Sequence, residues 1–108
     1  MPTYNKLVRD NIPNIIEKTG KKYQTRTLDE KEYINELKVK LGEEVEEYLQ
    51  TVSDEHSVED LADVLEIIHS LVKVHGTTME DLEAVRKEKE TKRGGFQERI
   101  FLIDVEDE

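Results

Sequence analysis

The chain has 108 residues, with 16 basic residues against 26 acidic ones, and a net charge of −10. This length predicts a single domain over residues 1–108, and the absence of cysteine excludes disulfides and zinc–thiolate sites. With this excess of acidic residues the chain lacks the basic surface that nucleic-acid binding requires, so we expect neither DNA nor RNA as a partner. No stretch has the apolar character of a signal peptide or a membrane span. We therefore expect no membrane partner and a cytoplasmic location.

Helix-start and helix-stop residues predict two helices in the first half of the chain. Residues 11–13 (Asn-Ile-Pro) suit the start of a short helix, and Gly20 can end it. Thr27 and Glu30 have the spacing of a capping box, and the pattern after them predicts a long helix to about Val52.

The second half of the chain predicts two more helices and an apolar tail. Residues 53–56 (SDEH) are typical of a polar turn, Ser57 can cap a third helix, and Gly76 can end it. Residues 77–80 (TTME) can start a fourth helix that ends near residues 94–95 (Gly-Gly). The tail IFLIDV, residues 100–105, is rich in strand-forming residues. The whole predicts an all-α, antiparallel bundle of about four helices with a short C-terminal strand or extended arm.

Carboxylates interrupt the apolar faces of the two long helices. One stripe of the second helix is apolar at Ile34, Leu37, Leu41, Val45, Tyr48 and Val52. At about 100° per residue, Glu44 lies at the edge of this stripe and Glu47 one turn further on the same side, whereas Glu43 points nearer the opposite face.

The third predicted helix is apolar over a wide arc, so we expect it to be largely buried. One stripe comprises Asp60, Asp63, Ile67, Leu71 and Val74, beside a second of Leu61, Val64, Leu65, Ile68 and Val72. Two aspartates thus occupy positions where aliphatic residues are expected, and unpaired carboxylates there are costly. Together with the glutamates of the antiparallel second helix they predict a site for a hard divalent cation such as Mg²⁺.

A purely structural interpretation competes with the metal site for each carboxylate taken alone. Asp60 could complete the cap begun by Ser57, and residues 43–47 could form a solvated charged face. Basic residues have the same ambiguity: Lys6, Arg9, Lys92 and Arg93 can bind phosphate, but basic residues at a helix C-terminus also complement its dipole. The joint carboxylate pattern on adjacent helices favours the metal.

Four segments, in order, resemble one family. EEVEEYLQ followed by EDLADVLEII is similar to the paired acidic signature of the MazG-like, all-α nucleoside triphosphate pyrophosphohydrolases. YNKLVRDNIP and KRGGFQERI resemble flanking motifs of a small branch related to phosphoribosyl-ATP pyrophosphohydrolase. The resemblance covers nearly the whole chain. It departs from the family at Asp60, where relatives have glutamate, and at Asn11, where they often have a basic residue.

The resemblance implies Mg²⁺-dependent hydrolysis of a nucleoside triphosphate, or a related nucleotide, to the monophosphate and pyrophosphate, with Mn²⁺ as a substitute ion. Metal-binding residues would be Glu44, Glu47, Asp60 and Asp63, with Glu43 accessory; the first four would also serve catalysis, and Lys6, Arg9, Lys92 and Arg93 would bind substrate. It also implies a homodimer or homotetramer and a role in clearing aberrant nucleotides. Two alternatives stay open: the phosphoribosyl-ATP step of histidine biosynthesis, and a non-enzymatic acidic helical module that binds a protein.

Overall fold

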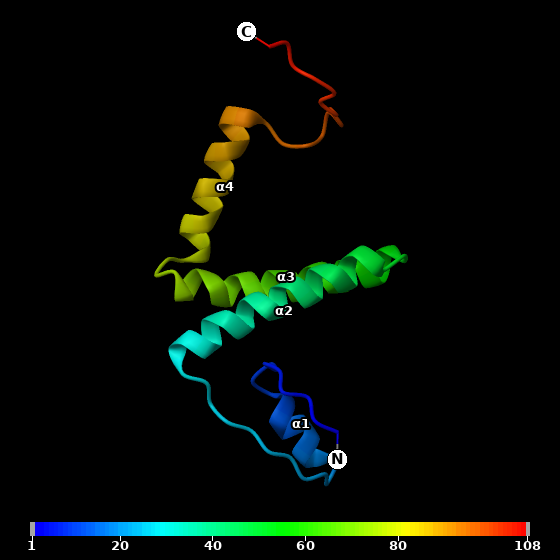
Figure 1. Ribbon diagram of the computed structural model, residues 1–108, viewed down its shortest axis with the longest axis vertical. Coiled ribbons are helices and arrows are strands. Elements are labelled where there is room, and N and C mark those ends of the chain that lie inside the picture. The colour runs from blue at the N-terminus through cyan, green and yellow to red at the C-terminus, as the bar shows by residue number, and fades with distance from the viewer. Residues whose placement is uncertain (1, 108) are drawn as a thin grey trace.

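The computed structural model describes residues 2–107, which contain four helices (Figure 1). They are α1 (Ile12–Lys18), α2 (Glu30–Gln50), α3 (Asp54–Val74) and α4 (Met79–Arg93). This confirms the all-α prediction. None of the helices in this part of the chain is long and apolar enough to cross a membrane.

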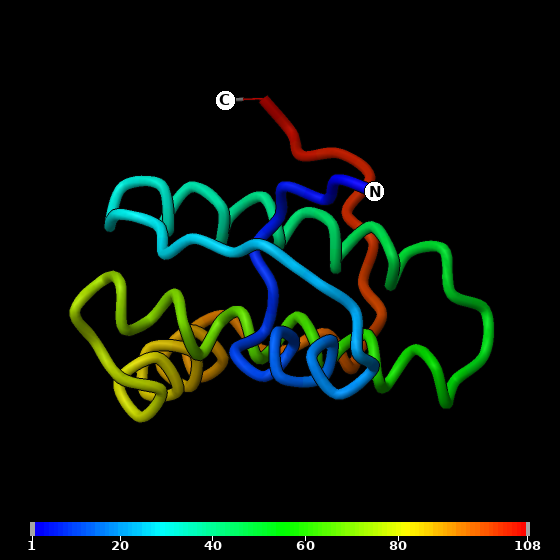
Figure 2. The backbone as a smooth tube through the Cα atoms, turned by 90° about the horizontal axis from the view of Figure 1, so that it is seen from below, coloured from blue at the N-terminus to red at the C-terminus, as the bar shows by residue number. Residues whose placement is uncertain are grey.

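A hairpin of α2 and α3 forms the centre of the molecule. The two helices run antiparallel and side by side, joined by residues 51–53, and they make the most extensive helix–helix contact in the described chain. In Figure 1, α1 lies on one side of the hairpin and α4 leads away on the other, starting at the C-terminal end of α3. Figure 2 shows the hairpin from below, with the long connection from α1 to α2 crossing over it.

The helix starts correct two of the predicted caps. The side chain of Asp29, rather than Thr27, begins α2 by accepting a 2.8 Å hydrogen bond from the Glu32 N–H. Ser53 begins α3 by accepting from the His56 N–H at 3.2 Å, so Ser57 is not the cap. The predicted turn SDEH is therefore already the first turn of α3, where acidic side chains favour the positive end of the helix dipole.

The other helix boundaries follow the prediction. Gly76, at a φ of 74°, ends α3, and its N–H donates a hydrogen bond to the Lys73 carbonyl. The next N–H, that of Thr77, donates to the Val72 carbonyl at 2.9 Å. This pairing satisfies carbonyls that the helix end would leave open. The Thr78 hydroxyl then caps α4 by accepting from the Asp81 N–H at 3.1 Å.

The apolar core of a single chain is small. Among the described residues, the buried apolar side chains are Leu37, Ile67 and Val72. The apolar stripe predicted on α2 is covered only in its first half; its second half, from Val45 to Val52, is exposed.

The expectation that α3 is largely buried is wrong for the single chain. Leu61 and Leu65 are 49% and 48% exposed. The stripe that contains Asp60, Asp63 and Ile67 faces α2. The second stripe is buried at Val72, near the end of α3 from which α4 leaves, and is open at Leu61 and Leu65 (Figure 1).

The overall dimensions reflect this open packing. The radius of gyration is 18.9 Å, compared with about 13 Å for a compact domain of this length. The chain exposes 10280 Å², roughly 4,000 Å² more than a compact monomer of the same mass. A single chain therefore leaves much of its apolar surface in water.

The C-terminal tail does not form the predicted strand in the residues that the structure describes. After α4 the chain makes a turn at residues 96–99, closed by the Arg99 N–H donating to the Phe96 carbonyl, and residues 100–107 continue as an extended arm that projects away from the helices (Figure 1). The strand needs a partner strand for its hydrogen bonds, and the arm has none beside it within residues 2–107.

Candidate functional site

A buried carboxylate lies at the centre of the α2–α3 hairpin. Glu44 is on the side of α2 that faces α3 and is only 9% exposed. Its Oε2 atom is buried and has no hydrogen-bond partner among residues 2–107. A buried acceptor left in this state destabilises a fold by about 1–3 kcal/mol, and more when it is charged.

The surroundings of Glu44 favour its protonated form. Burial raises the pKa of Glu44 above the ordinary value for a glutamate, and the nearby carboxylate of Glu47 raises it further. The negative charges of Glu47 and Asp63 act in the same direction, and Lys40 opposes them. The carboxylates of Glu47 and Asp63 therefore lie near enough to Glu44 to act on its charge.

Lys40 is a neighbour of the cluster that the sequence reasoning missed. Its Nζ lies 3.8 Å from Glu44 Oε1 and 4.0 Å from Glu43 Oε2, and the side chain is half-buried. A signal was present, because Lys40 precedes Glu44 by four residues, the spacing at which helical side chains meet. Lys40 neutralises part of the charge of Glu44 from one side of the cluster.

Asp60 is bound to the end of α2. The Thr51 hydroxyl lies 2.5 Å from Asp60 Oδ2 and 2.9 Å from the Glu47 carbonyl, so its single proton can serve one acceptor at a time. Asp60 is half-buried and faces α2 beside the turn. Thr51 was not predicted, since nothing in its spacing marks a residue just after a helix as a partner for the next one.

The N-terminal segment reaches the cluster through Arg9. Its guanidinium donates to Asp63 Oδ1 at 2.7 Å, which joins residues 54 positions apart. Arg9 was predicted to bind phosphate, and here it lies beside a predicted metal ligand. Lys6, from the same segment, places its ammonium group 5.4 Å from the centre of the Tyr4 ring.

The two basic residues predicted on the fourth helix lie elsewhere in the single chain. Lys92 pairs with Glu88 at 2.8 Å, and Arg93 lines a shallow hollow with Gly94, Gly95 and Phe96. Both are at the C-terminal end of α4, which points away from the hairpin in Figure 1. One chain does not bring them to the carboxylates.

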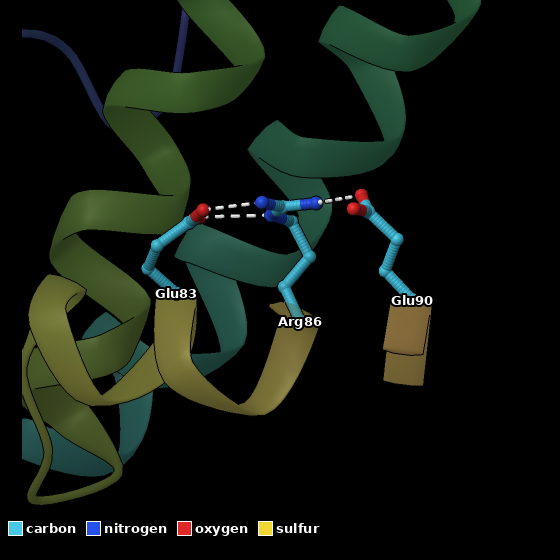
Figure 3. A network of polar contacts seen from close by, with 3 residues as sticks. All are labelled: Glu83, Arg86 and Glu90. Atoms are coloured by element: carbon cyan, nitrogen blue, oxygen red, sulfur yellow. Dashed lines mark hydrogen bonds and ion pairs between the residues drawn. The ribbon is translucent and has the colours of Figure 1, made fainter. Parts of the chain in front are cut away.

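A separate ion-pair network strengthens α4. Arg86 donates to both oxygens of Glu83 and, at 2.9 Å, to Glu90 (Figure 3). Bonding to Arg86 lowers the pKa of Glu83, and the two glutamates raise the pKa of Arg86. Exposed pairs of this kind each add only a little to the stability of a helix. The network supports a helix that has little apolar contact with the hairpin, and it is unconnected to the carboxylate cluster.

The carboxylate oxygens are suitable ligands for a hard cation, but several of them are already bonded to other side chains. Within residues 2–107 no three acidic or histidine side chains lie in an arrangement ready to hold a metal ion. Arg9, Lys40 and Thr51 occupy oxygens of the predicted ligands. The unpartnered oxygen of Glu44 is the feature that fits a cation, because oxygen ligands of this kind are those that Mg²⁺ prefers.

Comparison with protein-family models, curated proteins and solved structures finds no match to this chain. The chemistry of the site is therefore argued from the side chains described above and from the motifs in the sequence.

Proposed function

We propose that this chain is a Mg²⁺-dependent nucleotide pyrophosphohydrolase. It would hydrolyse a nucleoside triphosphate, or a related nucleotide, to the monophosphate and pyrophosphate. The observation that carries the proposal is Glu44, which is buried, has an unpartnered oxygen and lies near enough to the carboxylates of Glu47 and Asp63 to feel their charges. The order of the acidic motifs, which resembles the MazG-like enzymes, supports the same reaction.

The metal would be held by Glu44, Glu47, Asp60 and Asp63, with Glu43 accessory. Bound Mg²⁺, or Mn²⁺ in its place, neutralises phosphate charge and lowers the pKa of a bound water. Among the chain's own groups, Glu44 is the one whose environment favours holding a proton, since burial and two neighbouring carboxylates raise its pKa.

The basic residues would bind the phosphate groups of the substrate. Arg9 lies beside Asp63 and can exchange this carboxylate for a phosphate, to which a guanidinium donates two parallel hydrogen bonds. Lys6 lies on the same segment. Lys92 and Arg93, at the outer end of α4, would reach the carboxylates of another chain, which suits the homodimer or homotetramer that we also propose.

The expected physiological role is the removal of aberrant nucleotides, and the phosphoribosyl-ATP reaction is a second candidate substrate for the same chemistry. Both release pyrophosphate, so one assay addresses both. Pyrophosphate release would be measured from a panel of nucleoside triphosphates and phosphoribosyl-ATP, with and without Mg²⁺. The test variant is Glu47→Gln.

A matched control is available on the same helix. Glu46 is exposed, accepts a 2.8 Å hydrogen bond from Gln50 and stands outside the cluster. Metal-dependent release should be lost in Glu47→Gln and kept in Glu46→Gln. Release from no nucleotide, or equal release from both variants, would remove the enzymatic proposal and leave the acidic helical module that binds a protein.

A further inference from the structure

The C-terminal arm exposes a continuous run of large apolar side chains. Ile100, Phe101, Leu102, Ile103 and Val105 are 84%, 88%, 73%, 86% and 73% exposed. Isolated apolar residues on a surface need no explanation, but a contiguous run of this size marks an interaction site.

The alternation of side chains along the arm suits a segment that packs against another surface. In an extended chain, successive side chains point to opposite sides, so Phe101, Ile103 and Val105 form one fully apolar side. Ile100, Leu102 and Asp104 form the other. No backbone amide of residues 100–105 donates a hydrogen bond to another backbone group in the described chain. The arm has both an apolar side to bury and backbone groups free to pair.

A matching uncovered surface lies on α3. Val58, Leu61 and Leu65 follow one another at helical spacing and are each about half exposed or more. We call these three residues the α3 stripe. It lies on the side of α3 turned away from α2, in the N-terminal half of the helix, whereas α4 contacts α3 near its C-terminal end.

The arm of the same chain does not reach this stripe. With α4 in its observed direction, its 15 residues carry the arm about 22 Å from the hairpin. The stripe lies a further distance along α3 from the residue where α4 departs. Residues 94–99, which join α4 to the apolar run, span at most about 20 Å. In the observed arrangement the arm leaves from the outer end of α4 and does not lie against the stripe of its own chain (Figure 1).

We propose that the arm, residues 100–105, covers the α3 stripe of a second copy of this chain. The single chain exposes roughly 4,000 Å² more than a compact monomer of its mass, which exceeds the area that each partner of a stable complex buries, about 800 Å². A second copy carries the complementary surface by necessity, since each chain has one arm and one stripe. The proposal rests on packing alone and holds whether or not the chain is an enzyme.

Hydrogen exchange of the full, unaltered chain tests the proposal directly. At a concentration where light scattering gives the mass of an oligomer, the amides of residues 100–105 should exchange slowly. On dilution until the mass is that of a monomer, they should exchange at the rate of an unstructured peptide. Fast exchange in the oligomer, slow exchange that persists in the monomer, or a monomeric mass at every concentration would each overturn it.

Charge substitutions locate the two surfaces. Phe101→Glu on the arm and Leu61→Glu on the stripe should each weaken self-association roughly tenfold to a hundredfold, because a charge would be buried at the interface. Val39→Glu is the matched control, since Val39 is a half-exposed apolar residue on α2 away from the stripe. Helicity by circular dichroism shows that each variant is folded. Equal association of folded Leu61→Glu and Val39→Glu would exclude the stripe; if Phe101→Glu fails to fold, the exchange experiment decides.

Discussion

Replacing Glu44 by glutamine should stabilise the metal-free chain at neutral pH. The change keeps the size of the side chain and removes its charge. Glu44 is 9% exposed and lies near the carboxylates of Glu47 and Asp63, with Lys40 as the opposing cation. The glutamine amide can also donate to Glu47, which an ionised Glu44 cannot do.

The expected change in the free energy of unfolding follows from attractive and repulsive interactions of Glu44 that are similar in size. Lys40 Nζ lies 3.8 Å from Glu44 Oε1, and such a pair gains about 4 kcal/mol at an effective dielectric constant of about 20. Two nearby carboxylates oppose this attraction, and burial of the charge adds to their effect. Removing a charge in this position should stabilise the fold by about 1 kcal/mol, the low end of the cost of an unsatisfied buried acceptor. For a domain of this size that raises Tm by about 4–8 °C.

The difference between Glu44→Gln and the natural chain should depend on pH. Because the pKa of Glu44 is raised on folding, the folded chain binds more protons than the unfolded chain above the ordinary glutamate pKa. The stability of the natural chain therefore falls as the pH rises from that ordinary value through the raised one. Urea unfolding across this range should show the variant gaining its advantage as the pH rises. A difference that is constant with pH, or a variant less stable at neutral pH, would refute the reasoning.

Mg²⁺ should reverse the order of stability. A cation that binds only the folded chain adds about 2.7 kcal/mol at a hundredfold excess over its Kd. The natural chain and Glu46→Gln should both show this shift in thermal unfolding, and Glu44→Gln should lose it. An undiminished shift in Glu44→Gln would place the cation elsewhere.

Three further changes test other parts of the structure. Arg9→Gln should change the free energy of unfolding by less than about 1 kcal/mol, because the ion pair of Arg9 with Asp63 is exposed. It should also strengthen Mg²⁺ binding, because it frees the Asp63 carboxylate, and a calorimetric titration showing weaker binding would contradict this. Ile67→Ala should destabilise the fold by about 2–4 kcal/mol in urea, while the exposed Glu66→Ala changes little, and equal effects would mean that the hairpin core is elsewhere. Ser53→Ala should cost about 1 kcal/mol by removing the cap of α3, and an unchanged unfolding midpoint would show that the cap contributes nothing.

The sequence predicted the helices better than their ends. Periodicity and the breakers Gly20 and Gly76 located all four helices of the described chain, because these signals are local. Two caps were misplaced by a few residues, since Asp29 and Ser53 each lie close to another residue able to cap. For α3 the choice of Ser53 depends on where the hairpin turn closes, and that depends on the packing of α2 on α3.

The site shows the same division between local and tertiary information. Helical spacing predicted that Glu44 lies at the edge of the face that meets α3, and the structure places Glu44 near enough to Glu47 and Asp63 to feel their charges. Helical spacing did not predict the pairing of Thr51 with Asp60, which depends on how a three-residue turn folds back. The phosphate-binding role that the resemblance implies for Lys92 would need it near the carboxylates, and the direction of α4, set at its junction with α3, separates them in one chain.

The two proposals use different sides of α3. At about 100° per residue, Leu61 points well away from Asp60 and further still from Asp63. Asp60 and Asp63 face α2, while Leu61 faces outward, so an arm from a second chain can cover the stripe without covering the carboxylates. This accounts for the wide apolar arc of the helix beside its two aspartates. As we propose, one side is apolar because another chain covers it, and the other is acidic because it faces Glu44 and a cation.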